Sequence, residues 1–107
     1  MTRYGVMIRL RPEFESEYCL AHGAVPEPVL RTIERCNIRN YSIFLRDSIL
    51  FGYFEYAGSD FTADMAAMAA DPATQEWWSR MEPMQDPLPN CEPGEWWASM
   101  REVFHID

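Results

Sequence analysis

The stretch that decides the fold is residues 41–56, which read YSIFLRDSILFGYFEY. In its first half Tyr41, Ile43 and Leu45 alternate with their neighbours, which is the period of two typical of a strand with two faces. Asp47-Ser48 then supplies a short turn, and the second half is again strand-like. The stretch therefore predicts a β-hairpin.

The residues before the hairpin predict a strand and then a helical region. Side chains alternate from Tyr4 to Leu10, which indicates a half-buried strand. From Pro12 to about Cys36, apolar side chains recur at helical spacing. Gly23, Pro26 and Pro28 interrupt this run, so we expect two helical pieces or one broken helix.

Two short helices are predicted after the hairpin. Asp60 is a suitable N-cap for a helix that carries Met65 and Met68. Asp71-Pro72 provides an N-cap followed by a proline at the first helical position, which starts another helix reaching about Met81. Both helices follow the hairpin directly and can cover the same sheet.

The last quarter of the chain predicts a loop and a final strand. Pro83 to Glu95 holds four of the eight prolines, as expected for a binding loop or a linker. Trp97 to Ile106 is interpreted as the last strand. The resulting order, β-α-β-β-α-β, predicts one α+β domain over residues 1–107 with a ferredoxin-like sandwich. Because helices cover only one face of such a sheet, a second copy of the chain is the expected partner for the other face.

Charge and composition exclude several classes of function. Nine basic residues, all arginine, stand against 17 acidic ones, giving a net charge of −8. Such a chain repels nucleic acid and anionic membranes, and the absence of lysine excludes Schiff-base chemistry. No apolar run approaches the length of a membrane span. The odd set Cys19, Cys36 and Cys91 and the absence of a secretory segment predict a soluble protein of the reduced cytoplasm.

Motifs for metals, nucleotides and serine nucleophiles are missing from the sequence. His22 and His105 stand far apart with no HExxH, HxH or CxxC pattern, so we expect no metal site. There is also no GxGxxG, P-loop or GxSxG, which leaves nucleotide and serine-hydrolase functions without support.

The first candidate site residues are Tyr18 and His22, four positions apart on the first helix. Residues at this spacing are neighbours on one helix face. A histidine beside a tyrosine suits general acid–base work on a substrate hydroxyl. The simpler interpretation is that Tyr18 packs in the core and His22 ends the helix before Gly23.

The other candidates are aromatic. Trp77 and Trp78 are adjacent on a helix and diverge by about 100°, so one can anchor the core while the other lines a cavity for a sugar. Two core tryptophans are the alternative interpretation. Trp96-Trp97 could close a pocket, contact a partner or start a strand. Tyr41 opens a strand, where its hydroxyl can reach a cleft, although a strand-forming aromatic is the simpler interpretation.

Several motifs taken together resemble the L-rhamnose mutarotase family. They occur in order along nearly the whole chain: EYxxxH at 17–22, NYSIFL at 40–45, LFG at 50–52, WWxxM at 77–81 and EVFH at 102–105. The resemblance implies a dimeric α+β barrel and an isomerase of carbohydrate metabolism that interconverts the anomers of a 6-deoxy-hexose such as L-rhamnose. It implies neither a cofactor nor a metal.

The resemblance also assigns residues. It implies that His22 is catalytic with Tyr18 beside it, and that Tyr18, Tyr41, Trp77 and Trp78 contact the sugar. Two stretches depart from the family pattern: no tryptophan precedes Pro26-Glu27, and residues 86–97 replace a loop that commonly reads DNSP. L-fucose is therefore an alternative substrate, and a barrel monooxygenase or a non-catalytic binding module are alternative functions.

Overall fold

A computed structural model describes residues 1–107, and an antiparallel sheet is its frame. The strands are β1 (Thr2–Leu10), β2 (Ile38–Arg46), β3 (Ile49–Tyr56), β4 (Gln85–Asp86) and β5 (Ala98–Met100). Their order is β2-β3-β1-β4, and β5 also pairs with β1. This arrangement confirms the predicted α+β class and the ferredoxin-like order of strands.

The predicted hairpin is formed by β2 and β3. Leu45 pairs with Leu50 and Arg46 with Ile49, which leaves Asp47-Ser48 as a two-residue turn. Both turn residues have positive φ, 51° and 61°. Turns of this hand match the right-handed twist of the two strands, so the hairpin closes without splaying.

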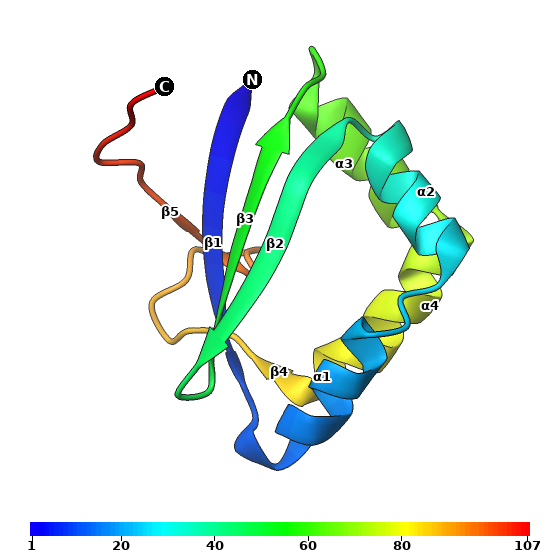
Figure 1. Ribbon diagram of the computed structural model, residues 1–107, viewed down its shortest axis with the longest axis vertical. Coiled ribbons are helices and arrows are strands. Elements are labelled where there is room, and N and C mark those ends of the chain that lie inside the picture. The colour runs from blue at the N-terminus through cyan, green and yellow to red at the C-terminus, as the bar shows by residue number, and fades with distance from the viewer.

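All the helices lie on one side of the curled sheet (Figure 1). They are α1 (Glu15–His22), α2 (Glu27–Arg35), α3 (Phe61–Ala70) and α4 (Pro72–Met81), with short 3₁₀ turns η1 (Pro12–Phe14) and η2 (Glu82–Met84). The predicted break in the first helical region falls between α1 and α2, where Gly23 and Pro26 stand.

The two predicted N-caps are also present. The Asp60 carboxylate accepts a hydrogen bond from the Ala63 amide at 3.1 Å. The Asp71 carboxylate accepts from both the amide and the hydroxyl of Thr74 at 2.9 Å. These bonds satisfy amide groups that a helix start otherwise leaves without partners, so α3 and α4 begin where the sequence predicts.

The core lies between the sheet and the helices. Eight buried residues form it, from β1, β3, α1, α2, α4 and η2: Ile8, Leu10, Tyr18, Val29, Leu50, Trp77, Met81 and Met84. Two of these, Tyr18 and Trp77, are also candidate site residues. The candidate site is therefore continuous with the core.

Replacing Leu50 by alanine is expected to lower the free energy of unfolding by roughly 2–5 kcal/mol, because the side chain is 1% exposed and its loss leaves a cavity. Leu20→Ala is the matched control, since Leu20 on α1 is 77% exposed and its loss should change stability by less than about 0.5 kcal/mol. Urea unfolding of both variants measures the difference. Equal stability of the two variants would contradict this account of the core.

The predicted final strand from Trp97 to Ile106 is wrong in its extent. Only Ala98–Met100 is a strand, and residues 101–107 have no regular structure. Val103, Phe104 and Ile106 of this segment are 76–83% exposed, so they contribute nothing to the core of the protomer. Part of the predicted loop instead forms η2 and β4, and β4 pairs with Arg9 and Leu10 of β1. The fourth strand position is thus shared by two short strands.

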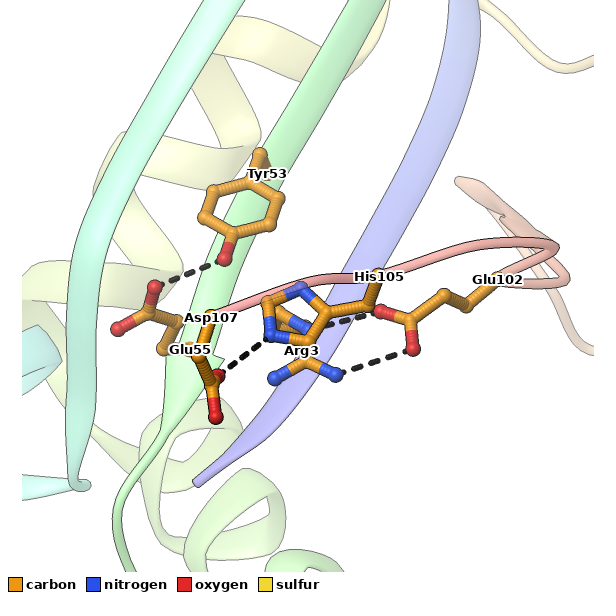
Figure 2. Close-up of polar contacts among 6 residues, drawn as sticks. All are labelled: Arg3, Tyr53, Glu55, Glu102, His105 and Asp107. Carbon is orange, nitrogen blue, oxygen red and sulfur yellow. Dashed lines mark hydrogen bonds and ion pairs between the residues drawn. The ribbon is translucent and has the colours of Figure 1, made fainter.

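The C-terminal segment crosses the sheet face that the helices leave uncovered (Figure 2). The Arg3 guanidinium donates two hydrogen bonds to the Glu102 carboxylate, at 2.8 and 3.0 Å. On the same face the Tyr53 hydroxyl donates to Glu55 at 2.7 Å. These polar contacts lie on the opposite side of the sheet from the core.

Candidate active site

A cavity of about 810 Å³ lies between the concave face of the sheet and the helices. Twenty of its 24 lining residues are hydrophobic, and this size and character suit a small organic ligand. All five site residues predicted from the sequence contribute to the wall: Tyr18, His22, Tyr41, Trp77 and Trp78. The fold thus brings together side chains from α1, β2 and α4.

His22 presents one ring nitrogen as a proton acceptor. It is the last residue of α1, and its Nδ1 lies 2.8 Å from the backbone carbonyl oxygen of Tyr18. Because a carbonyl only accepts hydrogen bonds, Nδ1 carries the proton. In the neutral ring Nε2 is therefore unprotonated and available to accept. The structure also agrees with the simpler interpretation, because Tyr18 packs in the core and His22 ends the helix directly before Gly23.

Tyr18 lies directly against His22, with ring centroids 4.3 Å apart. Its side chain is buried, and its hydroxyl accepts a hydrogen bond from the Gln85 amide nitrogen at 2.9 Å. Burial raises the pKa of the phenol above its ordinary value, and the bond from Gln85 opposes that shift. Tyr18 is thus a protonated hydrogen-bond donor at neutral pH.

Tyr41 reaches the cavity beside a β-bulge. It lies inside β2 and does not open the strand, because β2 begins at Ile38. The pairing register with β3 shifts between Arg39 and Ser42, and Asn40 there has a φ of 50°. The extra residue lets Ile38 and Tyr41, three positions apart, both line the cavity.

Tyr41 lines the cavity, and 43% of the residue's surface is accessible. Burial raises the pKa of Tyr41 to about 12, and the nearby Tyr18 phenol adds to the shift. Beneath the ring lies Gly52, where a Cβ would approach Tyr41 to 3.8 Å, Trp97 to 3.6 Å and Val6 to 3.0 Å. The absence of a side chain at this position lets both rings approach the sheet closely.

The adjacent tryptophans of α4 differ in burial, as their helical spacing predicts. Trp77 is 8% exposed and belongs to the core, whereas Trp78 is 39% exposed. Both nevertheless contribute to the cavity wall. The rings of Trp77 and His22 meet edge-on, with their centroids 5.2 Å apart. The Arg80 guanidinium carbon lies 5.2 Å from the centroid of the Trp77 ring. Trp77 is thus a core residue that packs directly against the candidate catalytic histidine.

Three further residues of the wall, Gln85, Trp96 and Trp97, lie on β4 or in the segment that follows it. Trp96 and Trp97 both line the cavity, in agreement with the pocket-closing alternative. Gln85, the first residue of β4, links Trp96 to Tyr18 by hydrogen bonds and was not predicted as a site residue. Nothing in the sequence marks it, because a single glutamine in a proline-rich stretch belongs to no spacing pattern.

The structure shows no metal-ligand cluster, no disulfide and no membrane-spanning helix. No group of three or more histidine, cysteine, aspartate or glutamate side chains is arranged to hold a metal ion. The three cysteines are free, and burial raises the pKa of the Cys36 thiol. None of the helices combines the length and the apolar character that crossing a membrane requires.

Proteins of known structure share this fold. A crystal structure of an L-rhamnose mutarotase from Formosa agariphila superposes with a TM-score of 0.78 at 17% identity, covering 100% of both chains. Tetracenomycin F2 cyclase from Streptomyces glaucescens, a type-II polyketide cyclase, superposes with a TM-score of 0.65 at 15% identity, again over 100% of both chains. At these identities the likeness concerns the fold alone, which carries more than one chemistry.

Sequence comparisons distinguish between those chemistries. The family model described as L-rhamnose mutarotase matches residues 3–106. The L-rhamnose mutarotase of Opitutus terrae is 32% identical, with 100% of both chains covered. That of Flavobacterium johnsoniae is 29% identical over 98% of this chain and 95% of its own. With a family match over almost every residue and a relative aligned along its full length, this chain belongs to the L-rhamnose mutarotase family.

Proposed function

We propose that this protein is an isomerase that interconverts the α and β anomers of L-rhamnose, without a cofactor. The observation that carries the proposal is the pairing of His22 and Tyr18 in one cavity. The Nδ1 of His22 bonds the Tyr18 carbonyl, which leaves Nε2 as the acceptor in the neutral ring, and Tyr18 offers a phenolic proton, with the two rings 4.3 Å apart. The choice of L-rhamnose as the substrate rests on the relatives that are named L-rhamnose mutarotase.

The proposed reaction needs only an acceptor and a donor of protons. Nε2 of His22 takes the proton of the anomeric hydroxyl while Tyr18 gives its proton to the ring oxygen. The bond between C1 and the ring oxygen breaks, and C1 becomes an aldehyde. Rotation about the C1–C2 bond exposes the other carbonyl face. On ring closure the C5 hydroxyl returns its proton to Tyr18 as its oxygen attacks C1, and His22 gives its proton to the former carbonyl oxygen, which becomes the new anomeric hydroxyl.

The aromatic wall suits the rest of the sugar. Indole and phenol rings pack against the apolar C–H faces of a pyranose, and their N–H and O–H groups bond its hydroxyls. We assign this contact to Trp77, Trp78 and Tyr41, which all line the cavity. The raised pKa of Tyr41, about 12, keeps its hydroxyl a donor at neutral pH.

Saturation-difference proton NMR on equilibrated L-rhamnose tests the proposal, with L-fucose measured in parallel. Transfer of saturation between the anomeric signals that depends on the protein, and that is stronger for L-rhamnose, is the expected result. Stronger transfer with L-fucose would reassign the substrate. No transfer with either sugar, from a folded protein, would contradict the proposal and revive the barrel monooxygenase and binding-module alternatives, which the family match does not favour.

We further propose that the active form is a homodimer built on the uncovered sheet face. Phe44, Phe51 and Met100 are 61%, 37% and 38% exposed there, and the rings of Phe44 and Phe51 lie 6.2 Å apart. Apolar side chains on an uncovered sheet face are stabilised when a second sheet packs on them. A second copy offers the same apolar surface by two-fold symmetry.

Sedimentation velocity at micromolar concentration is expected to give a dimer for the wild type and a monomer for Phe44→Asp, because a carboxylate would be buried in the interface. Leu20→Asp places the same charge on the exposed surface of α1 and should stay dimeric. A monomeric wild type would contradict the proposed interface.

We also expect the protein to work in the cytoplasm. Its three cysteines form no disulfide, and a reducing compartment keeps thiols in that state. Cell fractionation with an antibody to the native chain measures this directly.

A further inference from the structure

A chain of two hydrogen bonds behind the cavity ends on the hydroxyl of Tyr18. The indole nitrogen of Trp96 donates to Oε1 of Gln85 at 2.7 Å. Nε2 of Gln85 in turn donates to the Tyr18 hydroxyl at 2.9 Å. Gln85 is 5% exposed, and no buried polar side-chain atom in this chain lacks a hydrogen-bond partner.

The direction of these bonds follows from the donor groups alone. An indole N–H only donates, so the atom of Gln85 that faces Trp96 must be the carbonyl oxygen. The amide NH₂ is then turned toward Tyr18, whose oxygen must accept. The phenol keeps its own proton free for a bond to another group, and Tyr18 lines the cavity.

The backbone of Gln85 is also paired within the sheet. Gln85 pairs with Leu10 of β1, a residue that is 1% exposed. Backbone pairing fixes the start of the side chain, and the two hydrogen bonds fix its end. The amide is therefore preorganised before any sugar enters, which is the condition for a supporting group to act on catalysis.

We propose that Gln85, oriented by Trp96, is a positioning residue that makes Tyr18 a proton donor toward the substrate. The inference rests on the proposed anomer exchange. It adds the group that makes the Tyr18 oxygen an acceptor on one side and leaves the phenolic proton free for the substrate. Gln85 acts through Tyr18 and needs no contact with the sugar. Trp96 acts one bond further away and holds the amide in the productive orientation.

Three substitutions in the hydrogen-bond relay formed by Trp96, Gln85 and Tyr18 are expected to lower kcat more than they change KM. Gln85→Met keeps an unbranched side chain of similar length, removes both bonds and should slow exchange roughly tenfold. Gln85→Glu should slow it more, because a carboxylate accepts the Tyr18 proton and turns it away from the cavity. Trp96→Phe lets the amide flip and should cost about two- to fivefold. Gln75→Glu, at an exposed position of α4, is the matched control for the added charge.

A double-mutant cycle separates positioning from general damage to the fold. In a Tyr18→Phe background no phenolic proton remains, so Gln85→Met and Trp96→Phe should cause no further loss of kcat. Losses that persist in this background, or wild-type kcat in both relay variants, would overturn the inference. A wild type that gives no exchange would instead refute the proposed function.

A second measurement does not depend on turnover. The hydrogen bond from Gln85 lowers the pKa of the Tyr18 phenol, so its removal in Gln85→Met should raise that pKa. Carbon-13 NMR of tyrosine labelled at Cζ follows the titration residue by residue. An unchanged Tyr18 titration would overturn the inference even if the enzyme slowed. Trp96→Phe provides the same readout if Gln85→Met does not fold.

Discussion

Replacing His22 by alanine is expected to slow protein-dependent anomer exchange by about 10²- to 10⁴-fold, the contribution of a positioned general base or acid. The orientation of the imidazole supports this size of effect. Its Nδ1 is committed to the Tyr18 carbonyl at 2.8 Å, and its ring is packed between Tyr18 and Trp77. The ring is thus held before the sugar binds. Saturation transfer between the anomeric signals of L-rhamnose measures the rate.

Two further variants make this test specific. His22→Gln keeps hydrogen-bonding atoms but has no ring nitrogen that takes up a proton, so it should be about as slow as His22→Ala. His105→Ala removes the other histidine, which lies on the opposite side of the sheet with its Nε2 2.9 Å from Asp107 (Figure 2), and should leave the rate unchanged. If His22→Gln exchanges anomers as fast as the wild type, proton transfer by His22 is wrong.

The second large effect is expected from Tyr18→Phe, which should slow exchange by about 10²-fold. The change removes one oxygen and leaves the ring that packs on His22. Because burial raises the pKa of Tyr18, the wild-type phenol keeps its proton at neutral pH and serves as the donor to the ring oxygen. A phenylalanine has no proton to give. The kcat for L-rhamnose measures the loss.

A structural effect of this substitution is also expected and needs its own control. Loss of the hydroxyl leaves the Gln85 amide without its partner, which should cost about 1–3 kcal/mol of stability. Activity is therefore measured well below the melting temperature of the variant. Tyr53→Phe removes a hydroxyl that donates to Glu55 on the outer sheet face and should keep the wild-type rate. Equal rates for Tyr18→Phe and Tyr53→Phe would contradict the role of Tyr18.

Local chemistry made most of the fold predictable. The alternation from Tyr41 onward and the turn at Asp47-Ser48 specify the hairpin, because a period of two and a two-residue turn leave one register. Asp60 and Asp71 mark the helix starts through caps that lie within three residues of their partners. Each of these signals acts over a short distance along the chain, so the sequence displays it directly.

The fourth strand was harder to predict because its partner is remote. Gln85 pairs with Leu10 and Ala98 with Met7, so two short segments share one edge of β1. A strand of two residues has no periodicity to detect. The apolar residues after Met100 favour a longer strand by pattern, but in the structure Val103, Phe104 and Ile106 stay exposed.

The candidate site likewise contains residues that the sequence reveals and one that only the tertiary structure reveals. Tyr18 and His22 are visible because helical spacing makes them neighbours. Tyr41 and the paired tryptophans of α4 are candidates as aromatic residues, and the resemblance to the family favours their site roles over the simpler structural ones. Their catalytic and binding roles stay predictions, although all of them line one cavity. Gln85 was missed because its importance comes from two tertiary hydrogen bonds, to Trp96 and to Tyr18 across 67 positions of sequence.

The most direct test of the account compares the wild type with a variant carrying both His22→Ala and Tyr18→Phe, by saturation transfer between the α and β signals of L-rhamnose at neutral pH. The account predicts rapid transfer with the wild type and, with the folded double variant, only the slow exchange of sugar in buffer. Transfer by the double variant at the wild-type rate, or none by the wild type, would contradict it.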